Sequence, residues 1–336
     1  MAIPQDFIEN CRELLNRPRR VVITNHVNPD GDAVGSSLAL AAILQANGHR
    51  VKVLMPNNYP QNLKWLAGSD QVIFYEEQEM SARQVLGDAE VIFHLDYNGL
   101  ARSGPMQEAL ASSNATKVVI DHHQEPEDWP DLLYSDVKMS STSEMVFHFI
   151  KAMDWLGRLN RAIAEAIYTG IITDTGNFRF SSTSSSTHHA AAYLLEKGLE
   201  PAVVASRIYD QGSANRLALL ATMLGQMEIL PSGKAVLLHL SEQQLRQHKF
   251  QKGDSEGFVN YGLSIKGVEV SAFVVEKEGK VKLSFRSKTD FDVNRFARKH
   301  YDGGGHKNAA GAISEYNLPQ TLENLKSQLE AEEELT

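Results

Sequence analysis

Short apolar runs alternate with amphipathic stretches through the first half of the chain. Runs rich in Val and Ile predict β-strands at residues 20–24, 51–55, 72–75, 91–95 and 117–121. Apolar residues at helical spacing predict helices between and after them, at residues 33–47, 146–155 and 163–169. Strands that alternate with helices are typical of an α/β domain, and we expect a doubly wound, mostly parallel sheet.

The last third of the chain follows a different pattern. Strand-like alternation of β-branched and aromatic residues occurs at 234–240, 267–276 and 280–287, and helical spacing occurs at 291–301. Gly303, Gly304 and Gly305 predict a tight turn before an apolar run at 309–314. We expect a smaller α+β domain here. The predicted organisation is a first domain at residues 1–190, a helical linker at 191–225 and a second domain at 226–336.

Acidic and histidine side chains stand where the apolar runs of the first domain end. They are His26, Asp30 and Asp32 after the first run, Asp96 and the triplet Asp121-His122-His123 after two later runs, and Asp174 after a fourth. The carboxyl ends of parallel strands meet at one edge of a sheet, so we expect these side chains to converge. Five carboxylates in one place would repel one another without cations. The pattern therefore predicts a two-metal phosphoesterase site.

Helix capping is the alternative explanation for some of these residues. A single Asp after a strand is more often a helix cap or a turn residue than a metal ligand. Residues 28–31, Asn-Pro-Asp-Gly, have the composition of a turn, and Asp32 could cap a helix that begins near Ala33. Capping accounts for Asp32 and for Asp30. It leaves His26 and the other predicted strand ends unexplained.

These motifs, in their order and spacing, resemble those of the DHH phosphoesterase superfamily. The matching residues are His26-x-x-x-Asp30-x-Asp32, Asp96, Asp121-His122-His123 and Asp174. Near the C-terminus, Gly303-Gly304-Gly305-His306 followed by Ala309-Ala310-Gly311 resembles the signature of the associated DHHA1 domain. The resemblance covers nearly the whole chain and is nearest to the nanoRNase/pAp-phosphatase group of bacterial proteins.

The resemblance implies two divalent cations that share Asp96 as a bridging ligand. It places one ion on His26, Asp30 and Asp96, and the other on Asp32, Asp96, His122 and Asp174. Imidazoles among the carboxylates favour Mn²⁺, with Mg²⁺ or Co²⁺ as alternatives.

Asp121 and His123 are then expected to be catalytic residues rather than metal ligands. We expect Asp121 to orient His122 through its second ring nitrogen, as metal-binding histidines usually require. We expect His123 to face the substrate and to donate a hydrogen bond or a proton to the phosphoryl group.

The second domain contains candidates for substrate binding. Three successive glycines let backbone N–H groups approach an anion, although such runs also form flexible turns. His306 follows them directly, and Arg286 can bind a phosphate through two hydrogen bonds. In the resembled family these positions hold the phosphate and sugar of a nucleotide. Arg102, shortly after Asp96, is a candidate for contact with the scissile phosphate, and a surface role is equally open.

The resemblance implies a hydrolase that converts very short oligoribonucleotides to mononucleotides and 3′-phosphoadenosine 5′-phosphate to AMP. The alternatives within the same chemistry are a phosphodiesterase for cyclic or linear dinucleotides, a pyrophosphatase and a RecJ-type exonuclease. A nucleotide sensor without catalysis is expected to lack at least one ligand, and every ligand position is filled here.

Composition excludes some other classes of protein. The formal net charge of −9 argues against a broad basic surface for long duplex nucleic acid. Cys11 is the one cysteine, so no internal disulfide forms and a reducing compartment is favoured. We see neither a signal peptide nor an apolar run of the roughly 20 residues that a membrane helix needs. We expect a cytoplasmic protein without a membrane partner, and the oligomeric state is left open, a homodimer included.

Overall fold

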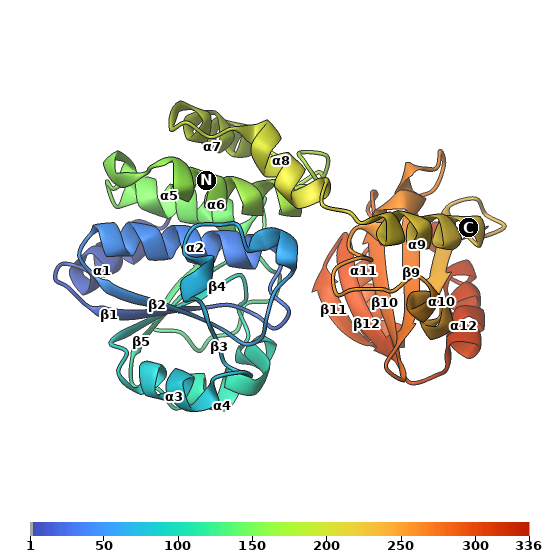
Figure 1. Cartoon of the computed structure of the whole chain (residues 1–336), viewed down its shortest axis with the longest axis horizontal. Helices are drawn as coiled ribbons and strands as arrows, with labels where there is room; N and C mark the ends of the chain where they lie inside the picture. The colour runs from blue at the N-terminus through green and yellow to red at the C-terminus, as the bar shows by residue number, and fades with distance from the viewer. Residues whose placement is uncertain (1–2, 336) are drawn as a thin grey trace. The chain divides into compact units, whose positions relative to one another are not determined.

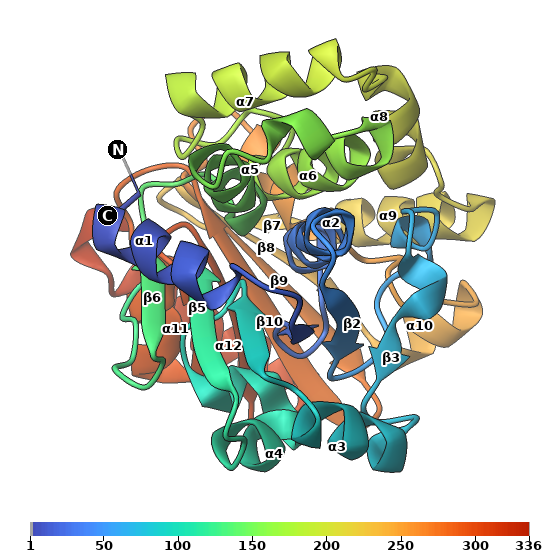
Figure 2. The same ribbon diagram turned by 90° about the vertical axis from the view of Figure 1, so that its left-hand side faces the viewer.

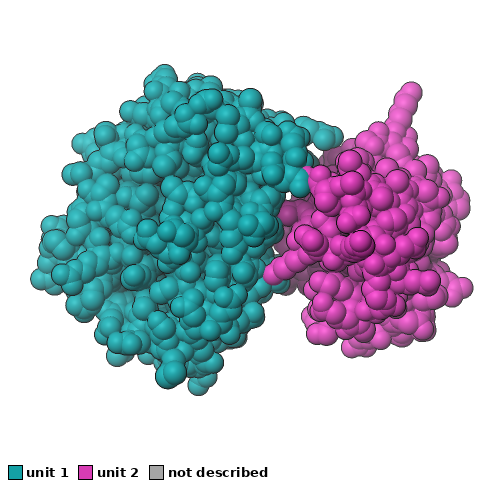
Figure 3. Space-filling view, in the orientation of Figure 1, with its two compact units in different colours: residues 1–211 teal, residues 212–336 magenta. Residues whose placement is uncertain are grey.

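The computed structural model describes residues 3–335. Two compact units divide the chain, residues 1–211 and residues 212–336 (Figure 3). The predicted domain limits at residues 190 and 225 remain predictions.

The first unit is built on a parallel six-stranded sheet. Its strands are β1 (Arg20–Thr24), β2 (Arg50–Met55), β3 (Ile73–Phe74), β4 (Val91–Leu95), β5 (Thr116–Asp121) and β6 (Leu132–Ser135). They lie in the order β3-β2-β1-β4-β5-β6, and every neighbouring pair is parallel. The order reverses between β1 and β4, which is the place where open α/β sheets bind ligands.

Helices cover both faces of this sheet, as the doubly wound prediction requires (Figure 1, Figure 2). The larger layer contains α1 (Gln5–Leu14), α2 (Gly31–Ala46), α5 (Thr142–Ala152), α6 (Arg161–Asp174), α7 (Ser185–Glu196) and α8 (Pro201–Tyr209). The smaller layer contains α3 (Glu79–Gly87) and α4 (Gln107–Ala111). Short 3₁₀ helices lie at Gln61–Leu63, Ser69–Gln71, Leu100–Met106 and Leu156–Arg158.

Burial on both faces explains why the strands read as continuous apolar runs. In β4, Val91, Phe93 and Leu95 belong to the core on one face, and Ile92 belongs to the core on the other. A strand covered on both sides has no position that favours a polar residue. Polar side chains therefore concentrate where each strand ends.

The second unit contains a mixed six-stranded sheet. Its strands are β7 (Glu228–Ile229), β8 (Ala235–Leu240), β9 (Val270–Lys277), β10 (Lys280–Ser287), β11 (Asp302–His306) and β12 (Ala309–Ser314). They lie in the order β11-β12-β10-β9-β8-β7, with β8 and β9 parallel and the other pairs antiparallel. One core packs against α11 (Val293–His300) and α12 (Leu318–Glu330), and a second against α9 (Ala214–Gly225), α10 (Glu242–Gln247) and the 3₁₀ helix Phe258–Ser264. A last 3₁₀ helix spans Glu333–Leu335.

The prediction of a tight turn at the glycine triplet was wrong. Gly303, Gly304 and Gly305 lie within the edge strand β11 and pair with Ala312, Gly311 and Ala310 of β12. The glycines allow an unusually close approach of the two strands, because a Cβ on Gly303 would lie 2.5 Å from the Cβ of Ala312. The turn itself follows His306.

Among residues 3–335, no helix combines the length and the apolar character that crossing a membrane requires.

Candidate metal centre

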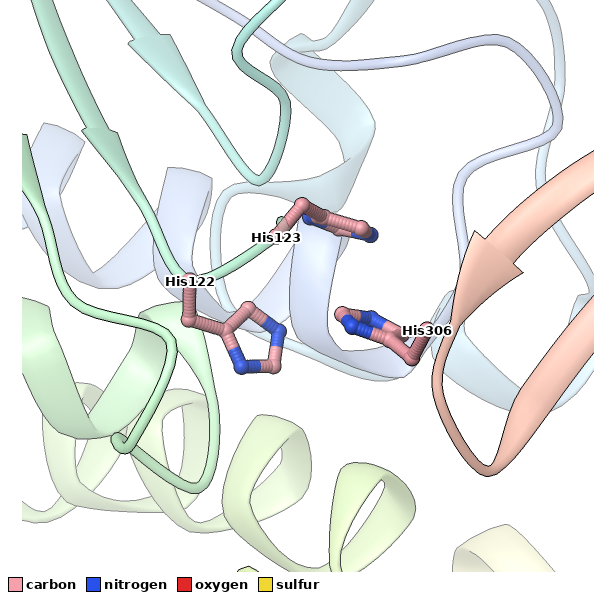
Figure 4. A group of neighbouring side chains, drawn as sticks. All are labelled: His122, His123 and His306. Atoms are coloured by element: carbon pink, nitrogen blue, oxygen red, sulfur yellow. The ribbon is translucent and has the colours of Figure 1, made fainter. Parts of the chain in front are cut away.

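Three strands of the first unit deliver polar side chains to the point where the strand order reverses. His26 follows β1, Asp96 follows β4, and Asp121 is the last residue of β5. His122 and His123 stand on the loop that leaves β5 (Figure 4), and their ring centroids are 5.2 Å apart. The predicted convergence of these strand ends is therefore present in the structure.

The start of α2 contributes two more of the predicted ligands, and the capping residue is not the one that the alternative explanation named. Asp30, not Asp32, caps the helix, because its Oδ1 accepts hydrogen bonds from the amides of Asp32 (3.0 Å) and Ala33 (3.1 Å). The helix begins at Gly31, two residues earlier than expected, so Asp32 lies inside it and is buried. Its carboxylate is thus available for other partners.

Asp174 ends a helix and does not follow a strand. It is the last residue of α6, and that segment was predicted as an apolar strand end. Helix α6 packs against α2 and α5 and is buried along most of its length, and a buried helix shows the same continuous apolar run as a buried strand. The packing is close, because a Cβ on Gly170 would lie 2.5 Å from Asp32 Oδ1. The C-terminal end of α6 therefore brings Asp174 to the same cluster.

Asp96 belongs to one group of side chains that could hold a cation and lies beside a second. In the first group, Asp96 Oδ2 lies 3.3 Å from His26 Nε2, and Asp30 completes the set. In the second group, His122 Nε2 lies 3.1 Å from Asp174 Oδ2 and 3.8 Å from Asp32 Oδ2. Asp96 Oδ1 is 3.6 Å from the same His122 nitrogen. The two oxygens of Asp96 thus face different groups.

The backbone at Asp96 adopts an uncommon conformation that turns its side chain into the cluster. Its φ of +65° lies in the left-handed region, which costs a non-glycine residue of the order of 1 kcal/mol. The amide of Asp96 donates to the carbonyl of Ile120 at 3.2 Å, and its carboxylate accepts from the hydroxyl of Thr142 at 3.0 Å. These contacts fix the strained turn.

Hydrogen bonds to carbonyl groups set the tautomers of two histidines. His26 Nδ1 lies 2.8 Å from the carbonyl of Val27, and His122 Nδ1 lies 3.2 Å from that of Met139. A carbonyl only accepts, so each Nδ1 carries a proton, and each Nε2 is directed at carboxylates. This is the arrangement that metal-binding histidines usually have.

Asp121 orients His123, whereas we predicted that it would orient His122. Its Oδ1 lies 2.7 Å from His123 Nδ1, and its Oδ2 accepts from the His123 amide at 3.0 Å. Successive side chains of an extended segment point to opposite sides, so residues 121 and 123 share a side and residue 122 does not. The carbonyl of Met139 takes the place that we had assigned to Asp121.

The groups of the cluster strongly influence one another's protonation. Burial, with the charges of Asp96 and Asp174, raises the pKa of Asp32 well above its usual value. Burial would also raise the pKa of Asp96, but the hydrogen bond from His26 and the nearby imidazoles outweigh it and hold that pKa well below its usual value. Burial lowers the pKa of His122, yet the hydrogen bond and charge of Asp174 reverse this and raise it well above the usual value. The crowded carboxylates therefore need positive charge within the cluster in order to stay ionised together.

The catalytic pair predicted beside the ligands has pKa values shifted in opposite directions. Burial raises the pKa of Asp121 to about 6. Burial, assisted by the charge of Arg102, lowers the pKa of His123 well below its usual value. Arg102 lies on the 3₁₀ helix Leu100–Met106, and its carbonyl accepts from the amide of Val27 at 2.9 Å, next to His26. Arg102 is therefore a neighbour of the cluster.

In the second unit, two predicted substrate-binding residues lie in one row of the sheet. Arg286 of β10 pairs with Ala309 of β12, and His306 of β11 (labelled in Figure 4) pairs with the same Ala309. Residues paired directly across strands point to the same face, so the side chains of Arg286 and His306 share a face of this sheet. Gly305 of the triplet donates its amide to Asn294 Oδ1 at 2.9 Å, which ties β11 to α11.

Two families match this chain. One, described as "DHH family, N-terminal domain", covers residues 20–171, and the DHHA1 domain covers residues 234–333. A bifunctional oligoribonuclease and PAP phosphatase NrnA of Thermus thermophilus is 30% identical over 323 residues, which are 94% of this chain and 90% of that protein. The chain belongs to the DHH family.

Two further relatives show how far this similarity extends. The crystal structure of an exopolyphosphatase-related protein from Bacteroides fragilis is 36% identical, covers 98% of this chain and 96% of its own, and has a TM-score of 0.94. The cyclic-di-AMP phosphodiesterase GdpP of Bacillus subtilis is 27% identical over 94% of this DHH-family chain, which spans 48% of GdpP.

The donor set of this DHH-family chain fits divalent cations. Each of the two groups combines carboxylate oxygens with an imidazole nitrogen, and within each group the ligand atoms lie within 4.8 Å of one another. Carboxylate with imidazole is a mixture that Mn²⁺, Co²⁺ and Zn²⁺ accept, and carboxylates alone suit Mg²⁺. Both the chemistry and the spacing of the side chains therefore suit a divalent cation at each group.

Sequence reasoning missed the segment that supports these ligands, residues 139–144. Both Asp32 oxygens accept backbone amides of this segment, from Thr142 at 2.6 Å and Ser143 at 2.8 Å. The sequence carries a signal for it, because Ser141-x-x-Glu144 is the pattern of a helix N-terminus and an N-terminus attracts anions. Ser141 indeed caps α5 by accepting the amide of Glu144 at 3.0 Å.

Proposed function

We propose that this protein is a metal-dependent phosphoesterase that hydrolyses very short oligoribonucleotides to mononucleotides and 3′-phosphoadenosine 5′-phosphate to AMP. The observation that carries the proposal is Asp96, whose two oxygens face separate groups of carboxylates and imidazoles. Membership of the DHH family indicates a hydrolase that acts on phosphoester bonds. The two activities of the Thermus thermophilus relative, oligoribonuclease and PAP phosphatase, support the two substrates.

We assign the two groups to two divalent cations. His26, Asp30 and Asp96 would hold one, and Asp32, Asp96, His122 and Asp174 would hold the other. We expect Mn²⁺ in preference to Mg²⁺ or Co²⁺, because imidazoles stand among the carboxylates. Such a pair of cations lowers the pKa of water and offsets the charge of a phosphoryl group.

His123 is assigned to the substrate side of this site. Its Nδ1 is held by Asp121, so the ring is fixed with Nε2 as its other polar atom. With Nδ1 donating to Asp121, Nε2 carries a proton only in the imidazolium form, and we assign that form to a hydrogen bond with a phosphoryl or leaving-group oxygen. Arg102 is assigned to the scissile phosphate, because its charge already acts on His123.

The DHHA1 domain is assigned to recognition of the nucleotide. Arg286 and His306 share a row and a face of its sheet, which suits two contacts to one anionic or hydroxyl-rich group. Gly303, Gly304 and Gly305 leave the backbone beside His306 without side-chain obstruction. A small recognition domain of this kind suits substrates of a few nucleotides.

A cyclic-dinucleotide phosphodiesterase is the second candidate. The match to GdpP over 94% of this chain favours it, whereas this chain spans only 48% of GdpP. Both candidates use the same metal centre, so only the substrate distinguishes them.

A substrate panel tests the proposal. Protein stripped of metal and reloaded with Mn²⁺ is assayed on a diribonucleotide, 3′-phosphoadenosine 5′-phosphate, cyclic di-AMP and pyrophosphate, with Asp96→Asn purified in parallel as a control for contaminating nucleases. We expect the first two substrates to have the highest kcat/KM and EDTA to abolish their hydrolysis. A higher kcat/KM for cyclic di-AMP or pyrophosphate contradicts the assigned substrates, and full activity after exhaustive chelation contradicts the metal centre.

A further inference from the structure

Residues 139–144 contact three of the proposed ligands at once. The carbonyl of Met139 lies 3.2 Å from His122 Nδ1. The amide of Thr142 donates to Asp32 at 2.6 Å, and the hydroxyl of the same residue lies 3.0 Å from Asp96 Oδ1. Asp96 follows β4, His122 follows β5 and Asp32 lies in α2, so one short segment contacts parts that are remote in the sequence.

Thr142 has a special position in this segment, because it holds two carboxylates through two different atoms. Its backbone nitrogen holds Asp32, which belongs to the group with His122 and Asp174. Its hydroxyl holds Asp96, which belongs to the group with His26. The two donor atoms are separated by three covalent bonds, so the χ1 rotamer of Thr142, which is restricted in a β-branched residue, sets their separation. Thr142 therefore fixes the distance between a ligand of one group and the ligand that both share.

Glu144 anchors the segment from within the protein. Its side chain has no solvent exposure, and its Oε2 accepts from the hydroxyls of Ser140 (2.5 Å) and Thr187 (2.8 Å). Thr187 belongs to the capping box that begins α7. Burial alone would raise the pKa of Glu144, but the hydrogen bond from His148, with those from Ser140, Ser186 and Thr187, lowers it to about 2. The carboxylate is therefore ionised throughout the neutral range. An ionised acceptor of this kind holds the turn before α5 against α7.

We propose that Thr142 is a positioning residue for the dinuclear centre: its hydroxyl sets the orientation of Asp96 and the spacing between Asp96 and Asp32. This inference rests on the proposed function, because it assigns Thr142 a role only if two cations share Asp96. A geometric role of this kind acts on metal affinity and on kcat, and it leaves substrate recognition by the DHHA1 domain intact.

The test compares Thr142→Val with Thr142→Ser in the full chain. Valine keeps the volume and the backbone amide but removes the hydroxyl, and serine keeps the hydroxyl. Groups that support metal ligands typically contribute 10–100-fold to metal affinity or activity, so we expect Thr142→Val to lose about that much Mn²⁺ affinity and kcat with little change in KM. Thr142→Ser should recover most of the loss. The electron paramagnetic resonance of the Mn²⁺ pair should also change in Thr142→Val, since it depends on the spacing of the two ions.

Ser141→Ala is the matched control. Ser141 caps the same helix one residue earlier and contacts no proposed ligand, so its loss weakens the α5 N-terminus without touching Asp32 or Asp96. Its metal affinity should stay near that of the wild type. The inference is overturned if Thr142→Val binds two Mn²⁺ ions with wild-type affinity and resonance, or if Ser141→Ala shows the same loss. A wild-type chain that binds no Mn²⁺ pair would instead overturn the proposed function.

Discussion

Replacing Asp96 with Asn tests the shared ligand most directly. The substitution keeps the volume of the side chain and removes a charge that lies 3.3 Å from His26 on one side and 3.6 Å from His122 on the other. Asp174→Asn is the comparison, because Asp174 belongs to one group only. The first variant should weaken both metal positions, and the second should weaken one.

The expected difference can be expressed as stability that Mn²⁺ confers. With free Mn²⁺ at about 100 times Kd, each independent site adds about 2.7 kcal/mol to the free energy of unfolding, hence about 5.4 kcal/mol for two. If loss of a ligand charge costs about 100-fold in affinity, the contribution of that site falls to RT ln 2, about 0.4 kcal/mol. The Mn²⁺-dependent stability should then be about 0.8 kcal/mol for Asp96→Asn and about 3.1 kcal/mol for Asp174→Asn.

Urea unfolding followed by tryptophan fluorescence measures this quantity in the relevant part of the chain. All three tryptophans, Trp65, Trp129 and Trp155, lie in the first unit, so their fluorescence reports its unfolding. The free energy of unfolding is compared between saturating Mn²⁺ and EDTA for each variant. Equal losses in the two variants, or two ions per chain retained in Asp96→Asn, would refute the assignment of Asp96 as the shared ligand.

Three other substitutions separate chemistry, recognition and structural support. His123→Ala should lower kcat and keep two Mn²⁺ ions per chain, whereas His122→Ala should lose metal; metal analysis showing the reverse would mean that the two roles are exchanged. Arg286→Ala should cost about 1.5–3 kcal/mol in kcat/KM on a diribonucleotide and spare a small artificial phosphodiester, because a charged hydrogen bond is lost. Lys282→Ala, on the same strand and face, is its control, and equal losses on both substrates in Arg286→Ala would argue against recognition. Glu144 has a pKa of about 2 in the folded chain against an ordinary 4.5, so its ionised form stabilises the fold above pH 4.5, and this stability is lost as the pH falls towards 2. Glu144→Gln should therefore be less stable than the wild type at pH 7, by about 3 kcal/mol, and the gap should close in denaturation curves below pH 4.5; a gap that is independent of pH would contradict this account.

The strand ends of the first unit could be predicted because burial on both faces leaves a strong signal. In β1, β4 and β5 most buried positions are apolar, with Thr24 and His94 among the exceptions, so a carboxylate or imidazole after the run stands out. Convergence then follows from the geometry of a parallel sheet. Convergence of the strand ends can be predicted without knowing the order of the strands in the sheet. That order depends on how the helices pack.

The same continuous apolar run led to a wrong prediction for Asp174, which we expected at the end of a strand. A buried helix is also apolar on all sides, so the run does not distinguish the two. Helix α6 lies between other helices, so few of its positions favour a polar residue. Its length, 14 residues, is the feature that distinguishes it from a strand. We had divided this stretch into a shorter helix and a separate apolar run, which concealed that length.

The partners of individual side chains depend on contacts that local sequence does not encode. Asp121 stands next to His122 in the chain but contacts His123, because alternation along an extended segment decides which side each residue faces. Met139 orients His122 from 17 residues away, and Thr142 reaches Asp32 across 110 residues. The sequence marks a helix start at Ser141-x-x-Glu144, but it does not show which carboxylate the amides of that helix start bind.

The contacts of the carboxylates explain how so many acidic groups, Asp32 and Asp121 fully buried among them, can lie close together. Asp30 accepts two amides at the start of α2, Asp32 accepts two amides at the start of α5, and Asp121 accepts the amide and the ring of His123. A carboxylate whose only partner was a cation would leave a buried, unpaired charge in the metal-free chain, at a cost of several kcal/mol. Here the protein supplies hydrogen-bond donors to each of these three groups before any cation binds. Cations would therefore bind ligands that are already in place. Little of the free energy of binding would be used to order the site, so the affinity would be higher.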